Sequence, residues 1–251
     1  MARAAVPRRL GERLVWRTST LVEERRESPT ARTLVFEVPG WPGHLAGQHV
    51  DVRLTAEDGY STQRSYSIAS AADCELIELT VQRVSDGEVS PYLVDQFAPG
   101  DQVEFRGPVG GWFVWRPEQS EPVMLIAGGS GLVPLMSMIR TRRTLADRAR
   151  FRLLYSVRTP EDQLYRSELR REDPGLDVAN LYTRRAPESS PRPAGRLMGD
   201  DVTEWGWPPA DEPTVYICGP TSFVESAANL LVDFGHETGR IRAERFGPSG
   251  G

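Results

Sequence analysis

Hydrophobic residues in the first half of the chain alternate with polar ones. The runs VDVRL (50–54) and IELTV (77–81) each place their apolar side chains at every second position, which is typical of a strand with one buried face. Turn signals such as VPGWPG (38–43) and GPVGG (107–111) separate such runs at short intervals. This pattern predicts a small antiparallel Greek-key β-barrel, in which SPYLVDQF (90–97) forms a short helix.

We place the barrel domain at residues 11–116 and a linker, RPEQSEP, at 116–122. Beyond the linker, apolar runs are too short for helices and do not alternate cleanly, as expected of strands buried on both faces. We therefore predict an α/β domain with a doubly wound parallel sheet over residues 121–247. The predicted strands are VMLIAG (123–128), FRLLYSV (151–157), VANLYT (178–183), TVYIC (214–218) and RIRAERF (240–246).

Two helical stretches lie between these strands, at 132–147 and 222–234. The second opens with Ser222 and Glu225, three positions apart, which predicts a capping box.

Composition and charge exclude several classes of function. With 251 residues, 39% hydrophobic and 26% charged, the chain has the composition of a soluble globular protein. A formal net charge of −5 leaves no electrostatic footprint for nucleic acid. No apolar run approaches the roughly 18 residues that span a bilayer, and MARAAVPRRL lacks the apolar segment of a secretory signal. We expect a cytoplasmic monomer that binds neither nucleic acid nor membranes.

Cysteine and histidine do not indicate a metal centre. Cys74 and Cys218 are far apart and neither belongs to a C-x-x-C pair, so there is no spacing for zinc or an iron–sulfur cluster. His44, His49 and His236 are scattered, and we interpret them as satisfied or exposed side chains. We expect no metal.

Two glycine-rich turns follow predicted strands of the second half. GGSG (128–131) precedes a helix whose first turn accepts Pro134, so its backbone amides can face a phosphate. CGP (218–220) ends the fourth of these strands before another helix. Tight strand-to-helix connections also favour glycine, so one turn alone is weak evidence. In a doubly wound sheet, however, the ends of the first and fourth strands flank the crevice where ligands bind.

The barrel half contributes RSYS (64–67), at the end of a predicted strand. Arg64 and Tyr66 fall on one face of that strand and Ser67 on the other. An arginine can hold a pyrophosphate, a tyrosine can stack on a flat ring, and a serine can bond a ring nitrogen. These groups suit a flavin, but they also suit a strand-end salt bridge beside a half-buried tyrosine and an exposed serine.

The motifs occur along the chain in the order of a known family. Together they resemble the ferredoxin–NADP reductase superfamily of flavoproteins, most closely the bacterial reductase components of oxygenases, and the resemblance covers nearly the whole chain. The motifs are RSYS (64–67), GEVSPYL (87–93), GPVGGWF (107–113), GGSGLVP (128–134), YICGP (216–220) and ERF (244–246).

The resemblance implies an FAD site in the barrel. Arg64 would bind the pyrophosphate, Tyr66 would pack against the isoalloxazine ring, and Ser67 would lie near the flavin N5. Ser90 would give its hydroxyl and amide to the pyrophosphate, assisted by Val89. The other residues that we assign to this site are Ser65, Val81, Arg83 and Gly87.

The resemblance also implies a nicotinamide nucleotide on the second domain. Cys218 and Glu244 would approach the nicotinamide and the flavin N5, and with Ser67 they would align the rings for hydride transfer. Phe246 would cover the other flavin face, although GPSGG follows it here, whereas many relatives end at or just after this aromatic residue. Each of these three residues also has a purely structural interpretation. Cys218 would be a small buried residue, Glu244 an exposed strand residue and Phe246 a core aromatic. The backbone positions assigned to the nucleotide are Gly128, Gly129, Gly131, Gly219 and Pro220.

The choice of nucleotide depends on the end of the second strand of this domain. There SVR supplies Ser156 and Arg158, and further arginines follow at 166, 184 and 185. We expect NADPH, with NADH as the alternative, because a 2′-phosphate needs such cations.

The function implied is hydride transfer from NAD(P)H to FAD, followed by release of electrons to an acceptor. Neither end of the sequence carries a ferredoxin-like segment with clustered cysteines, so we expect a separate acceptor protein, a ferredoxin or an oxygenase component. The alternatives are a reductase of free flavins or small molecules, and a flavin-binding electron-transfer subunit without its own NAD(P)H turnover.

Overall fold

The computed structural model describes residues 14–56, 58–145 and 148–247. The chain divides into two compact units, of which the first comprises the residues up to Arg116 together with Met136–Thr141. The second comprises the rest of the chain from Pro117 onward. Residues 11–13 of the predicted barrel domain and residues 146–147 of the predicted helix lie outside the described residues.

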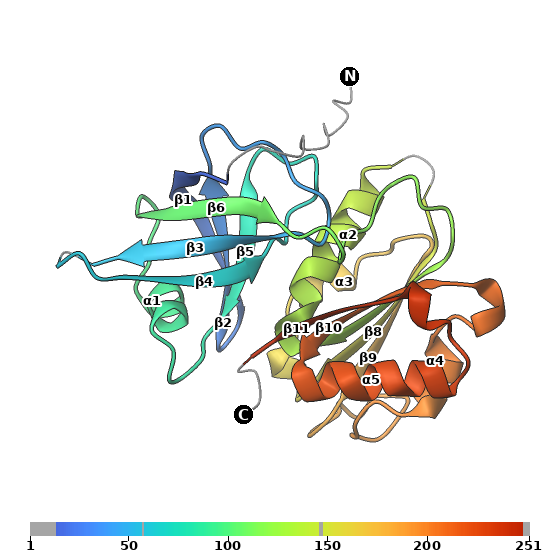
Figure 1. The fold of residues 1–251 in the computed structure, drawn as a ribbon. Helices are drawn as coiled ribbons and strands as arrows, with labels where there is room; N and C mark the ends of the chain where they lie inside the picture. Colours follow the sequence, from blue (N-terminus) through green and yellow to red (C-terminus); the bar gives the residue numbers. More distant parts are fainter. Residues whose placement is uncertain (1–13, 57, 146–147, 248–251) are drawn as a thin grey trace. The chain divides into compact units, whose positions relative to one another are not determined.

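The first unit is built on a six-stranded antiparallel sheet with the order β4-β3-β6-β1-β2-β5 (Figure 1). An antiparallel bridge between Ile68 and Leu79 joins the chain after β4 to β5. The predicted antiparallel barrel is therefore confirmed. Its elements are β1 (Trp16–Ser28), β2 (Ala31–Glu37), β3 (His49–Thr55), β4 (Ser61–Ser67), β5 (Ile77–Gln82), α1 (Val89–Asp95) and β6 (Gln102–Val109).

Alternation in β3 decides which side chains enter the barrel core. Val50 and Val52 are fully buried in the cluster that fills the barrel, and burial of side chains of this size stabilises the fold by about 1.5–3 kcal/mol each. Asp51 and Arg53 point to the opposite face, where they form ion pairs with Arg106 and Glu104 on β6.

The second unit is built on a five-stranded parallel sheet with the order β11-β10-β7-β8-β9. The strand order reverses between β7 and β10, so the predicted doubly wound α/β fold is confirmed. Its strands are β7 (Val123–Gly128), β8 (Phe151–Val157), β9 (Leu176–Tyr182), β10 (Thr214–Pro220) and β11 (Ile241–Phe246). The α-helices that follow β7 are α2 (Leu132–Arg143), whose residues Met136–Thr141 belong to the first unit, α3 (Arg166–Leu169), α4 (Gly199–Trp205) and α5 (Thr221–Asp233).

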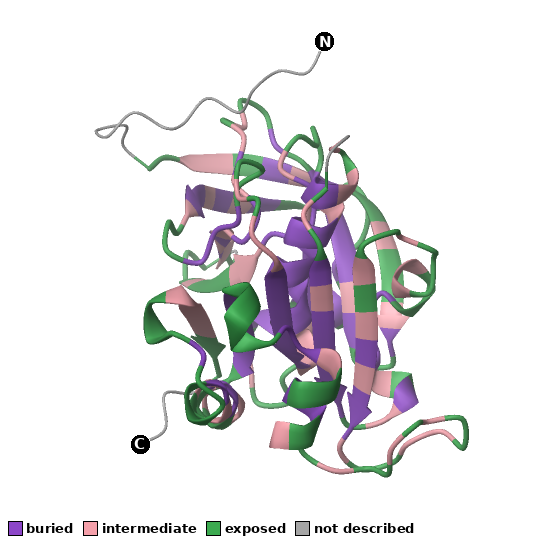
Figure 2. Ribbon diagram, turned by 90° about the vertical axis from the view of Figure 1, so that its right-hand side faces the viewer, coloured by how far each residue is buried: buried purple, intermediate pink, exposed green. Residues whose placement is uncertain are grey.

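Every residue of β7 is buried, and the buried positions along this sheet are coloured purple in Figure 2. Strands covered on both faces do not need a polar side, which explains the continuous apolar runs. Helix α5 packs against β10 and β11, and Val224 and Leu231 on this helix belong to the same core cluster as Ile126 of β7.

The predicted Ser222–Glu225 capping box is wrong. Helix α5 begins at Thr221, with Pro220 in the N-cap position and no side-chain cap. The reason is that Pro220, the last residue of β10, is extended and takes the N-cap position, with φ of −57° and ψ of 147°. The helix thus begins earlier than predicted, and Ser222 lies inside its first turn.

Within the described residues, no helix has the length and apolar character required to cross a membrane. The same part of the chain contains no group of three or more His, Cys, Asp or Glu side chains arranged to hold a metal ion.

Candidate functional site

Arg64 and Tyr66 share the inner-facing side of the edge strand β4. In the antiparallel register, Tyr66 lies opposite Val50 and Arg64 opposite Val52, and directly opposed residues point to the same face. Tyr66 is half-buried and packs against the barrel core. Its burial raises the pKa of the phenol to about 12, against the opposing influence of Arg64. The hydroxyl is therefore a neutral hydrogen-bond donor throughout the ordinary pH range.

The guanidinium of Arg64, two positions before Tyr66 on β4, is exposed to solvent. One of its nitrogens, Nη1, donates to the carbonyl of Gln63 at 2.7 Å and to the hydroxyl of Thr62 at 3.4 Å. Among the described residues, no carboxylate forms an ion pair with Arg64, so the alternative of a strand-end salt bridge is not observed. The remaining guanidinium nitrogens can therefore bind an anionic ligand bidentately.

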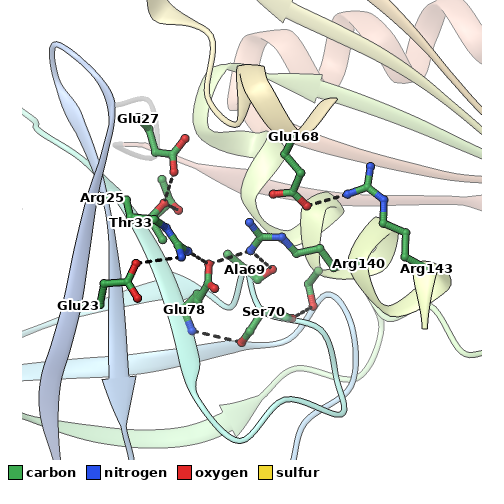
Figure 3. Close-up of polar contacts among 12 residues, drawn as sticks. Glu23, Arg25, Glu27, Thr33, Ala69, Ser70, Glu78, Arg140, Arg143 and Glu168 are labelled. Atoms are coloured by element: carbon green, nitrogen blue, oxygen red, sulfur yellow. Dashed lines mark hydrogen bonds and ion pairs between the residues drawn. The ribbon is translucent and has the colours of Figure 1, made fainter. Parts of the chain in front are cut away.

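The backbone that follows Ser67 is held in place by polar contacts within the first unit (Figure 3). Arg140 donates to the carbonyl of Ala69 and to the carboxylate of Glu78, both at 2.9 Å. Ser137 donates to the carbonyl of Ser70 at 2.7 Å. Ser137 and Arg140 could not be predicted from motifs, because they are far from RSYS in the sequence and carry no motif of their own.

The predicted pyrophosphate residues gather at the start of α1. The hydroxyl of Ser90 accepts a hydrogen bond from the amide of Val84 at 3.0 Å, which leaves its proton available for a ligand. Val89 and Ser90 are buried. A Cβ added to Gly87 would lie 3.2 Å from the Ser90 oxygen, so a glycine here keeps this corner open.

Three other residues assigned to the FAD site make contacts within the barrel unit. Val81 is fully buried in the core, so only its backbone is available to a ligand. Arg83 forms an exposed ion pair with Asp95 at 2.7 Å, and Ser65 donates to Asp51 at 2.7 Å. These three assignments remain predictions.

In the second unit, the two glycine turns meet at the point where the strand order reverses. A Cβ added to Gly131 would lie 2.1 Å from the carbonyl oxygen of Cys218, and one added to Gly219 would lie 3.2 Å from the Cα of Gly128. The turn after β7 and the carboxyl end of β10 are therefore in direct contact through glycine positions. Gly129 has a φ of +56° and open space around its Cα, so its backbone can approach a ligand closely.

Cys218 and Glu244 are neighbours on the parallel strands β10 and β11. Cys218 is only 2% exposed, and burial, with a further contribution from Glu244, raises the pKa of its thiol. Burial also raises the pKa of Glu244 to about 7. A carboxyl group with a pKa in this range changes its charge near neutral pH, and such pKa shifts are common at active sites. Phe246 is 37% exposed, so it is not a core aromatic.

At the carboxyl end of β8, arginines differ in how they are paired. Arg185 forms an ion pair with Glu161, and that bond holds the pKa of Glu161 down at about 2. Arg158 and Arg184 have no carboxylate partner among the described residues, and the Arg184 amide donates to the Arg158 carbonyl at 3.0 Å. Ser156 at the end of β8 is buried. Arg158 and Arg184 are thus cations available to a ligand at this strand end.

Comparison with known proteins agrees with this division into two binding domains. Residues 18–114 match the oxidoreductase FAD-binding domain family, and residues 125–229 match the oxidoreductase NAD-binding domain family. The reductase subunit of an aromatic O-demethylase from Amycolatopsis sp. is 30% identical over 243 residues, which cover 92% of this chain and 70% of that protein. The chain belongs to the ferredoxin–NADP reductase superfamily.

A further relative is similar in sequence, and a solved structure has the same fold. A flavohemoprotein from Bacillus cereus is 27% identical over 216 residues, which cover 82% of this chain and 54% of that protein. The chain thus spans about half the length of the first curated relatives that it matches. The FAD/NAD-binding domain of a nitric oxide dioxygenase from Vibrio cholerae has the same fold, with a TM-score of 0.79 and 24% identity, covering 92% of this chain and 99% of that one.

Proposed function

We propose that this chain is an FAD-dependent NAD(P)H oxidoreductase that passes electrons to a separate acceptor protein, a ferredoxin or an oxygenase component. The pairing of Cys218 with Glu244 carries this proposal, since a flavin-binding subunit without NAD(P)H turnover would have no need of it. The likeness to the reductase subunit of an aromatic O-demethylase supports the assignment of a protein acceptor.

The residues of the barrel unit fit an FAD. Arg64 would bind the pyrophosphate with the guanidinium nitrogens that have no protein partner, and Ser90 would donate its free hydroxyl proton to the same group. Tyr66 would support the isoalloxazine ring, and Ser67 would hydrogen-bond its edge. When bound, FAD supplies the chemistry that the protein lacks, namely hydride acceptance and electron release.

The residues of the second unit fit a nicotinamide nucleotide. Gly128, Gly129 and Gly131 would let backbone amides approach its phosphates. Side chains at Gly128 and Gly131 would collide with Phe223 and Cys218 and displace this backbone, while Gly129 has open space around it. Cys218 and Glu244 would orient the nicotinamide ring, and orientation of reacting groups is a major source of rate enhancement. Neither residue has to become a covalent nucleophile.

An anaerobic titration tests this function directly. The purified protein should be yellow, and NADH or NADPH should bleach the flavin absorbance in stoichiometric amounts. The reduced protein should then transfer electrons to an oxidised ferredoxin faster than to free flavin. A protein that binds flavin but is not bleached by either nucleotide would disprove the oxidoreductase assignment, and faster transfer to free flavin would disprove the protein acceptor.

Replacement of Arg64 tests the FAD site. Arg64→Ala is expected to weaken FAD binding by about 1.5–3 kcal/mol, roughly tenfold to a hundredfold, because a charge-assisted contact is lost. Isothermal titration of the apoprotein with FAD measures the change. Arg26→Ala is a matched control, since Arg26 is an exposed arginine of the same sheet that bonds only to backbone carbonyls. Equal FAD affinity in the Arg64 variant and the parent would remove Arg64 from the site.

Replacement of Arg158 tests the preference for NADPH. Arg158→Ala is expected to lower kcat/KM for NADPH by roughly tenfold to a hundredfold and to leave kcat/KM for NADH nearly unchanged, since only NADPH carries a 2′-phosphate. Arg185→Ala is the control, because the Arg185 guanidinium is already paired with Glu161. A parent enzyme that prefers NADH would contradict this prediction before any variant is made.

A further inference from the structure

A tyrosine outside the RSYS motif continues the row that contains Tyr66 and Arg64. Tyr60 directly precedes β4 and is 58% exposed. Its carbonyl accepts a hydrogen bond from the amide of Ala56 at 2.8 Å, which holds it in the hairpin that joins β3 to β4. Thr62, Arg64 and Tyr66 follow at alternate positions, so the side chains of this row leave the strand in the same direction.

Two contacts of residues in this row support the alignment. The Arg64 guanidinium reaches the Thr62 hydroxyl at 3.4 Å, as expected of neighbours on one face. The Tyr60 hydroxyl donates to the carboxylate of Glu88 at 3.3 Å, and Glu88 immediately precedes α1. The bond to Glu88 restrains the hydroxyl end of the Tyr60 side chain. More than half of the tyrosine surface remains exposed and available to a ligand.

We propose that Tyr60 is the platform on which the adenine of FAD stacks, and that this contact makes the chain select FAD over FMN. The inference rests on the proposed function, because it requires the flavin to lie along β4. If Tyr66 supports the isoalloxazine ring and Arg64 holds the pyrophosphate, the nucleoside must continue toward Thr62 and Tyr60. Four residues of strand span about 13 Å from Arg64 to Tyr60, which accommodates a ribose and a purine.

The chemistry of the Tyr60 ring suits this ligand. A flat aromatic side chain stacks on a purine without needing a particular hydrogen-bonding pattern, and loss of one such contact weakens binding by roughly tenfold. FMN has no adenine, so it would contact Tyr66 and Arg64 but would not extend to Tyr60. The two flavins therefore separate the role of Tyr60 from that of the rest of the site.

Binding of FAD, FMN and ADP to the apoprotein tests the proposal without any measurement of activity. The parent should bind FAD at least about tenfold more tightly than FMN. Tyr60→Ala should weaken FAD and ADP binding by roughly tenfold and leave FMN affinity within about twofold, which also shows that the barrel remains folded. Tyr60→Phe keeps the ring and loses only the bond to Glu88, so its preference for FAD should persist.

The outcomes distinguish the inference from the proposed function. A parent that binds FAD and FMN equally well, or a Tyr60→Ala variant that keeps its preference for FAD, would overturn the role of Tyr60 and leave the flavoprotein assignment intact. Equal weakening of FAD and FMN in Tyr60→Ala would also overturn it, because the effect would then not be specific to adenine. A parent that binds neither flavin would overturn both.

Discussion

Gly131→Ala is expected to slow reduction of the flavin by NAD(P)H by roughly a hundredfold while FAD remains bound. The added Cβ would lie 2.1 Å from the carbonyl oxygen of Cys218 and 2.4 Å from its carbon. Both are backbone atoms of a buried strand, so the two glycine turns would have to separate. A displacement of about 1 Å in the groups that position a substrate lowers the reaction rate by roughly a hundredfold. Stopped-flow reduction at saturating FAD measures the loss.

A second glycine of the same unit provides the control. A Cβ at Gly239 would meet only a side-chain oxygen of Glu237, at 3.7 Å, which is an ordinary contact. Gly239→Ala should therefore reduce its flavin at the parent's rate. The FAD content of Gly131→Ala should equal that of the parent, since the barrel residues are untouched. Normal reduction by Gly131→Ala would show that the contact between the turns is not needed for nucleotide binding.

Glu244→Gln is expected to remove the pH dependence of flavin reduction near neutrality. The pKa of Glu244 is raised to about 7 by burial, so the side chain is mainly neutral below that pH and mainly a carboxylate above it. The nicotinamide ring becomes positively charged as hydride leaves, and a nearby carboxylate stabilises that charge. The parent's rate should thus rise between about pH 6 and pH 8.

The amide of glutamine is neutral at every pH, so the variant should show a flat profile. At about pH 8 it should be roughly tenfold slower than the parent, and at about pH 6 the two rates should converge. Glu225→Gln on the exposed surface of α5 is the control and should keep the parent's profile. A parent rate that does not change with pH, or a Glu244→Gln variant that retains the change, would remove the carboxylate from the hydride step.

Local patterns in the sequence were sufficient for most of the fold. Alternation in segments such as 50–54 predicts the barrel strands, and continuous apolar runs such as 123–128 predict the parallel sheet. Both patterns lie within short segments of the sequence. They therefore predict strands without any knowledge of the tertiary structure. The prediction at Ser222 and Glu225 failed because Pro220, the last residue of β10, takes the N-cap position, so that α5 begins before Ser222.

The types of side chain available to the site can be predicted from short motifs: an arginine and a tyrosine at alternate positions of a strand, glycines after strands, and a cysteine and a glutamate near the ends of two strands. The charge state and partners of these side chains depend on tertiary contacts. Arg64 proved to have no carboxylate partner among the described residues, and Cys218 proved to lie beside Glu244. The pKa of Glu244 moved to about 7 through burial. Ion pairing and desolvation depend on residues distant in sequence, such as those that pack around β11, and short motifs do not encode them.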